Sequence, residues 1–155
     1  RVTSAGVARL LAGVLGDEAA YEFVRRLVFV VVSGNFDAHL KNWSLIYRDR
    51  RMPMLTPLYD QVATIAWPEI KRELALKLAG TKNVFQVSRD MLVRMGERAG
   101  LAAGRTAQAV DQTLARLGEA WRVTAVHLGW PEGHRQALQE YWSRLPLVEG
   151  VAPFA

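Results

Sequence analysis

The sequence predicts a mainly α-helical domain that carries one small β-hairpin. Apolar residues recur three and four positions apart in five segments, which is the spacing of one buried helix face. Two short segments rich in β-formers, about residues 43–47 and 54–56, are separated by a charged stretch at 48–52, as in a hairpin. Half of the 155 residues are hydrophobic, which suits a single domain with its own core over residues 1–155.

Two helices are expected before the hairpin. The first is predicted over residues 3–14. Asp17 is the expected N-cap of the second, over about 18–32. Toward its end the second helix becomes apolar all round, which is typical of a helix buried at the centre of a domain. Its β-branched end would also suit a strand, but the helical periodicity begins well upstream. Gly34 is expected to end this helix.

The segments after the hairpin are expected to be one strand and three helices. Leucines alternate over residues 74–78, as in a half-buried strand. Ser88 is the expected N-cap of a helix that ends near Ala99. A long helix is predicted over about 106–128, and its inward stripe is Val110, Leu114, Leu117, Trp121 and Leu128. Pro131 is expected to start a last helix, whose buried face is Leu138, Tyr141, Trp142 and Leu145.

Composition narrows the cellular setting and the class of partner. The chain has no cysteine, which excludes disulfides and thiolate metal sites and fits a cytoplasmic location. No apolar run approaches the roughly 20 residues that cross a bilayer, so no membrane partner is expected. The net charge of +5 is best explained by a solvated basic surface, and no direct nucleic-acid contact is expected. The chain begins at Arg1 rather than methionine, so we expect a fragment of a longer protein.

A polar loop at residues 33–42 follows the central helix and carries the candidate chemistry. Within it, Asp37 and Asn42 are separated by four residues, which is the catalytic-loop spacing of protein kinases. A second acid, Asp60, follows the hairpin, whose geometry should bring Asp60 and the loop to the same end. Magnesium prefers hard oxygen ligands, so one or two carboxylates, an amide oxygen and substrate phosphates would complete its shell.

The full motif is more specific than this spacing. Gly-Asn-x-Asp-x-His-x-Lys-Asn begins at Gly34 and is followed by the hairpin and by Pro-x-Tyr-Asp, which ends at Asp60. This pattern resembles the HipA-like family of bacterial serine/threonine kinases, many of which are toxins of toxin–antitoxin pairs. The match extends from about Val28 to Asp60, and residues 73–80 are similar to a further family segment. The resemblance implies the helical C-terminal lobe of a kinase.

The resemblance also implies a role for each residue of the site. Asp37 would orient and deprotonate the substrate hydroxyl, and Asn42 and Asp60 would bind Mg²⁺ with ATP. His39 would hold the loop or touch phosphate, and Lys41 would face the nucleotide. The alternative for each is structural: a loop-capping acid, a turn amide, a helix cap, a loop-holding histidine and a solvated lysine.

Two features depart from the eukaryotic-type kinase pattern. Gln61 and Val62 follow Asp60 in place of Phe-Gly, so a phenylalanine switch between active and inactive states cannot be carried over. The sequence also contains no Gly-rich phosphate loop with a strand lysine, so the N-terminal lobe is expected to be absent from this chain. We therefore expect an uncovered apolar face and no ATP turnover by the chain alone.

Three functions are compatible with the sequence. The first is the catalytic lobe of a HipA-like serine/threonine kinase; the resemblance implies a protein substrate such as an aminoacyl-tRNA synthetase and a small DNA-binding antitoxin as partner. The second is a non-catalytic docking or regulatory module with the same fold. The third is a basic helical nucleic-acid binder, which is disfavoured because no helix-turn-helix or Arg-rich groove helix is recognisable.

Overall fold

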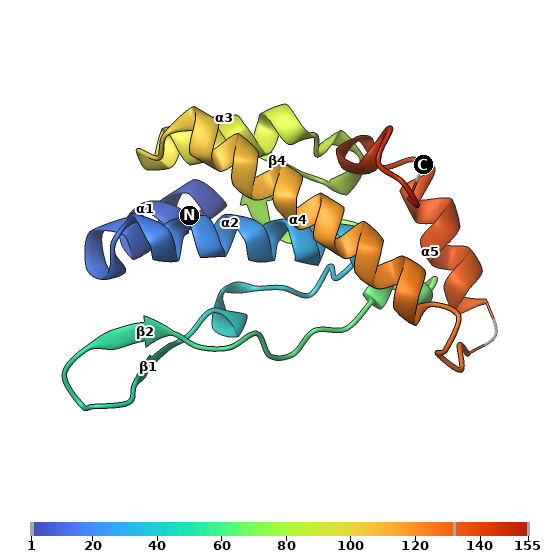
Figure 1. Cartoon of the computed structure of the whole chain (residues 1–155), viewed down its shortest axis with the longest axis horizontal. Coiled ribbons are helices and arrows are strands. Elements are labelled where there is room, and N and C mark those ends of the chain that lie inside the picture. The colour runs from blue at the N-terminus through green and yellow to red at the C-terminus, as the bar shows by residue number, and fades with distance from the viewer. Residues whose placement is uncertain (1, 132, 155) are drawn as a thin grey trace.

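The computed structural model describes residues 2–131 and 133–154. Its α-helices are α1 (Ser4–Leu15), α2 (Asp17–Val32), α3 (Arg89–Ala99), α4 (Ala103–Thr124) and α5 (His134–Trp142). Its strands are β1 (Leu45–Tyr47), β2 (Pro53–Leu55), β3 (Glu73–Leu78) and β4 (Thr81–Asn83). The mainly helical prediction is confirmed (Figure 1). In the part of the chain that the structure describes, no helix combines the length and apolar character needed to cross a membrane.

The central helix α2 organises the core. α1 and α4 both pack against it (Figure 1). Its last turns are buried on nearly every side, including Leu27, Val28 and Val31. Burying one such side chain contributes about 1.5–3 kcal/mol, which outweighs the small helix penalty of a β-branched residue. The prediction of helix rather than strand for this segment is therefore confirmed.

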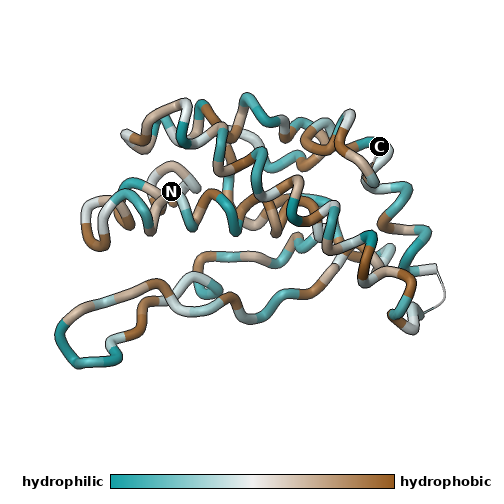
Figure 2. The backbone as a smooth tube through the Cα atoms, in the orientation of Figure 1, coloured by the Kyte–Doolittle hydropathy of each residue, from teal (hydrophilic) through white to brown (hydrophobic). Residues whose placement is uncertain are grey.

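The β-structure consists of two separate antiparallel hairpins rather than one. In the first, Leu45 pairs with Leu55 and Tyr47 with Pro53. This hairpin projects from the helical body, and its turn is hydrophilic (Figures 1 and 2). The second joins β3 to β4 through Ala79 and Gly80, both at positive φ. The prediction of a single hairpin is wrong. The second hairpin could not be recognised in the sequence, because β4 is three residues long and too polar to show an alternating pattern.

Several helix boundaries differ from the predicted ones. Gly16 occupies the N-cap position of α2, so Asp17 lies in the first turn, where its charge still favours the helix dipole. α4 ends at Thr124, which leaves Leu128 outside the helix and 53% exposed. α5 begins at His134, three residues after Pro131. The predicted cap of α3 is confirmed, since the Ser88 hydroxyl accepts a hydrogen bond from the Met91 N–H.

Candidate functional site

The polar loop starts at a turn that requires glycine. Gly34 follows the end of α2 with φ at +66°, in the left-handed region that other residues avoid. Its carbonyl accepts hydrogen bonds from the Ile65 N–H and the Thr64 hydroxyl, each at 3.0 Å. The Thr64 hydroxyl also accepts from the Phe36 N–H at 2.8 Å. The start of the loop is thereby bound to a short 3₁₀ helix at Thr64–Ala66.

The C-terminal helix holds the end of α2. The Tyr141 hydroxyl donates to the Val31 carbonyl at 2.6 Å, and Trp142 Nε1 donates to the Val32 carbonyl at 2.8 Å. Burial raises the pKa of Tyr141 far above its usual value, so the hydroxyl remains a donor. These bonds supply donors to two carbonyls of the last turn of α2, where i+4 helical partners are missing, and the Val31 carbonyl also accepts from the Gly34 N–H at 3.1 Å. The loop is therefore delivered from a fixed point.

Asn42 and Asp60 meet through their side chains. Asn42 Nδ2 donates to Asp60 Oδ2 at 3.1 Å and lies 3.4 Å from the backbone carbonyl oxygen of Asp37. Asn42 is only 6% exposed, whereas Asp60 is open to solvent. Because both contacts use the amide nitrogen, the amide oxygen of Asn42 is the atom left for a cation. The structure thus brings together the two side chains that the sequence assigns to magnesium.

The remaining predicted site residues lie in the same loop without such contacts. Asp37, His39 and Lys41 are exposed, and their side chains make no hydrogen bond to another residue within 2–131 or 133–154. The Asp37 carbonyl accepts from the His39 N–H at 2.7 Å, which is a backbone contact. All three share the 33–42 loop with Asn42. Their chemical roles stay predictions.

Sequence reasoning missed three residues that bind the loop to the Asp60 segment. Asn35 is 1% exposed, and its Oδ1 accepts a hydrogen bond from the Asp37 N–H at 3.0 Å. Its Nδ2 lies 3.3 Å from Gln61 Oε1. The Tyr59 hydroxyl donates to the Lys41 carbonyl. Asn35 and Tyr59 both fall within the quoted motif, but a single sequence cannot distinguish a buried, bridging side chain from an ordinary loop residue.

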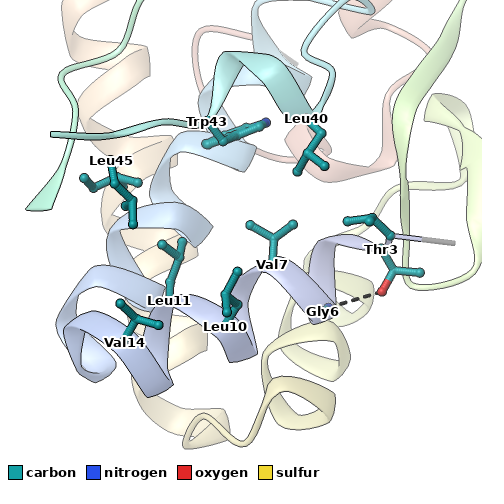
Figure 3. Close-up of a pocket in the computed structure, with 11 residues that line it drawn as sticks. Thr3, Gly6, Val7, Leu10, Leu11, Val14, Leu40, Trp43 and Leu45 are labelled. Carbon is teal, nitrogen blue, oxygen red and sulfur yellow. Dashed lines mark hydrogen bonds between the residues drawn. The ribbon is translucent and has the colours of Figure 1, made fainter. Parts of the chain in front are cut away.

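An apolar hollow of about 520 Å³ lies between α1 and the 3₁₀ turn Leu40–Asn42 at the end of the loop. Figure 3 shows side chains of α1 facing those of the loop and β1 across it: Val7, Leu10, Val14, Leu40, Trp43 and Leu45. We call this surface the α1 groove. Its volume falls within the range of small-molecule pockets. The expected exposed apolar face is therefore present, and it adjoins the polar loop.

The chain matches known proteins in sequence and in fold. The family described as the HipA-like C-terminal domain matches residues 2–121. Two Sinorhizobium fredii proteins, named "Putative kinase Y4dM" and "Putative kinase Y4mE", are 39% identical over 124 residues and 32% identical over 90 residues. These matches cover 77% and 56% of this chain and 30% and 21% of those proteins. This chain thus corresponds to less than a third of either relative.

The fold is similar to that of one chain in a solved complex of HipA, HipB and operator DNA, a toxin–antitoxin system of Shewanella oneidensis MR-1. The TM-score is 0.74 at 20% sequence identity, and the match covers 97% of this chain and 37% of that chain. At this identity the likeness concerns the fold alone. The family match, which covers most of the chain, shows that the protein belongs to the HipA-like C-terminal domain family.

Proposed function

We propose that this chain is the catalytic lobe of a HipA-like serine/threonine protein kinase that transfers the γ-phosphate of ATP to a protein hydroxyl. The observation that carries the proposal is the direct contact between the Asn42 and Asp60 side chains, in the loop that also holds Asp37. The activity would belong to a longer polypeptide, because this chain spans 30% of the relative Y4dM. The relatives' names support kinase chemistry.

The residues of the site fit magnesium in kind and number. An amide oxygen on Asn42 and a carboxylate on Asp60 are hard donors of the type that Mg²⁺ accepts. Within 2–131 and 133–154, no three His, Cys, Asp or Glu side chains gather into a metal site. A pair of protein ligands is nevertheless the usual arrangement where phosphates and water supply the remaining ligands. When bound, Mg²⁺ would neutralise charge on the phosphates.

The chain's own residues would act by position and charge. Asp37 would accept a hydrogen bond from the substrate hydroxyl, orient it and take its proton as the oxygen attacks phosphorus. Its exposure in the loop leaves room for a protein substrate. Lys41 would place a positive charge near the phosphates, and His39 would hold the loop. Phosphoryl transfer depends on such placement more than on covalent chemistry by the protein.

The partners follow as parts of the same proposal. The serine/threonine acceptor would belong to a translation-linked protein such as an aminoacyl-tRNA synthetase, and a small DNA-binding antitoxin would restrain the kinase. The fold likeness to a chain of the HipA, HipB and operator DNA complex supports the antitoxin. In this proposal the antitoxin binds the DNA, so no direct contact between this chain and DNA is needed.

Substitution of the two acids tests the proposal. In the longer protein, Asp37→Asn and Asp60→Asn should each reduce radiolabelled phosphate transfer by at least about 1,000-fold, because each removes a charge that acts on the transferred group. Asp90→Asn is the matched control, since Asp90 is exposed on α3 and outside the site. The 155-residue chain alone should not turn over ATP. Full transfer by Asp37→Asn would overturn the role of Asp37 as the base, whereas a wild-type longer protein that transfers no phosphate would favour the non-catalytic docking module.

A further inference from the structure

Asp60 adopts a left-handed backbone conformation. Its φ is +55°, in a region that few non-glycine residues occupy, although aspartate and asparagine enter it more readily than most. Such conformations persist where the surroundings hold them. The carboxylate that meets Asn42 therefore depends on contacts that keep the Asp60 backbone in place.

Two amide side chains supply those contacts. Gln61 Nε2 donates to the Tyr59 carbonyl at 2.8 Å, and Gln61 Oε1 faces Asn35 Nδ2 at 3.3 Å. Asn35 Nδ2 also lies 3.5 Å from the Asp60 carbonyl oxygen, at the outer limit of a hydrogen bond. The carbonyls of Tyr59 and Asp60 are thus held by Gln61 and Asn35 together.

The same asparagine reaches the catalytic loop. Asn35 Oδ1 accepts from the Asp37 N–H at 3.0 Å, and the Asn35 side chain is almost fully buried. One amide therefore contacts the backbone of the candidate base on one side and the segment of the candidate metal ligand on the other. In this chain, Gln61 stands where the eukaryotic-type pattern has phenylalanine.

We propose that Asn35 and Gln61 act as a pair of positioning residues that set Asp60 relative to Asp37. The inference rests on the proposed function, because it concerns the placement of a base and a metal ligand. An amide at position 61 fixes this segment by hydrogen bonds, which are directional, and so holds Asp60 ready for magnesium. Loss of either amide should loosen both segments at once.

Hydrogen exchange of the metal-free chain tests the coupling without any activity assay. Gln61→Ala leaves Asn35 Oδ1, the acceptor of the Asp37 N–H, in place. If Gln61 did not act through Asn35, its loss would therefore not change exchange of the Asp37 amide. We expect Gln61→Ala to speed exchange of the Asp37 amide at least about threefold. The effect should disappear in an Asn35→Ala background, where the link is already cut. If Asn35→Ala does not fold, Asn35→Asp serves as the background instead, because it keeps an oxygen that accepts from the Asp37 N–H and removes the nitrogen that contacts Gln61.

Asn83 provides a matched control. Its Oδ1 accepts from the Phe85 N–H at 3.0 Å, which is the same local contact that Asn35 makes with Asp37, but it lies on the second hairpin. Asn83→Ala should speed exchange near Phe85 and leave Asp37 unchanged. An Asp37 amide that exchanges at the wild-type rate in Gln61→Ala would overturn the proposal.

Magnesium dependence separates this inference from the proposed function. In the longer protein, Gln61→Ala should raise the Mg²⁺ concentration for half-maximal phosphate transfer about tenfold, and excess Mg²⁺ should restore most of kcat. Asn83→Ala should match wild type. An unchanged Mg²⁺ requirement would overturn the positioning role. A wild-type protein that transfers no phosphate would overturn the kinase proposal, while the exchange experiment would still decide whether the amide pair couples the two segments.

Discussion

At position 34 the site depends on the absence of a side chain. A Cβ added to Gly34 would lie 2.6 Å from Ile65 Cγ2, and the backbone φ is +66°. The close approach lets the Gly34 carbonyl reach both Thr64 and Ile65, which binds the loop to the segment after Asp60. One residue therefore combines a left-handed turn with a tight contact between two parts of the site.

Gly34→Ala should lower the free energy of unfolding by more than about 2 kcal/mol. The left-handed conformation alone costs a non-glycine residue about 1–2 kcal/mol, and the clash with Ile65 adds to it. Gly13→Ala is the control, since Gly13 lies inside α1 and its added Cβ would meet nothing within 4 Å beyond its chain neighbours and the adjacent backbone of its own helix. That change should stabilise the chain by up to about 1 kcal/mol. Urea denaturation followed by circular dichroism measures both, and equal effects would contradict the argument.

At the scale of elements, α5 supports the site from a distance. Its residues Tyr141 and Trp142 bind the last carbonyls of α2, more than 100 residues earlier in the chain. The loop that follows α2 is therefore fixed at its base by a helix that contributes no candidate site residue. Loosening α5 should affect the site through α2.

Tyr141→Phe should reduce stability by about 0.5–1.5 kcal/mol, because it removes a buried hydrogen bond to the Val31 carbonyl, which then keeps only the Gly34 N–H at 3.1 Å as donor. Tyr47→Phe is the matched control: Tyr47 is exposed on β1, and its hydroxyl has no hydrogen-bond partner among the described residues. It should change stability by less than about 0.5 kcal/mol. Thermal and urea unfolding of the two variants would give the comparison, and a neutral Tyr141→Phe would mean that this bond does not support α2.

The ion pair that joins the start of α3 to the middle of α4 should make stability depend on pH. Arg89 donates to both carboxylate oxygens of Asp111, at 2.7 and 2.8 Å, and this hydrogen bonding lowers the pKa of Asp111. A lowered pKa in the folded state means that the stabilisation is present above the unfolded pKa, about 3.9, and is lost as pH falls through the folded value. The pair is half exposed, so its contribution should stay below about 1 kcal/mol.

Asp111→Asn should therefore destabilise the chain slightly at pH 7, and the difference from wild type should shrink as the solution is made more acidic than about pH 4. Asp90→Asn serves as the control, because Asp90 lies 4.0 Å from Arg89 and is more exposed. Urea midpoints measured from pH 7 to pH 3 give the profile. A difference that does not vary with pH would show that the ion pair is not its cause.

At the scale of the whole molecule, the α1 groove and the projecting hairpin leave apolar surface open beside the polar loop. Leu10 and Val14 on α1 and Leu40 and Leu45 beyond it are all exposed. Within the isolated chain, contiguous apolar surface of this kind favours association.

Leu10→Glu should weaken self-association of the isolated chain. Leu10 is 64% exposed and lines the α1 groove, so a charge there opposes burial of the groove without entering the core. Val126→Glu is the control, because Val126 is 69% exposed but lies after α4, outside the groove. Sedimentation velocity over a concentration series should show a shift toward monomer for Leu10→Glu alone. The same shift in both variants would indicate a general charge effect.

The sequence by itself determined the helical class, the buried central helix and the polar motif from Gly34 to Asp60. These features depend on local periodicity, on glycine at a helix end and on residue spacing, which one sequence displays directly. Helix ends near 103, 124 and 134 were less predictable, since caps there lack a side-chain signal and Gly104 lies within α4.

Only the tertiary structure decided how the site is held. The contacts of Asn35 with Gln61, of Thr64 with Gly34 and of Tyr141 with Val31 join residues 26 to 110 positions apart. Polar side chains of these kinds occur in any loop, and their burial becomes visible only when distant segments pack. The sequence could name Asp37, Asn42 and Asp60, whereas the packed chain determined that Asn42 and Asp60 meet and that the buried amide of Asn35 links the Asp60 segment to the backbone of Asp37.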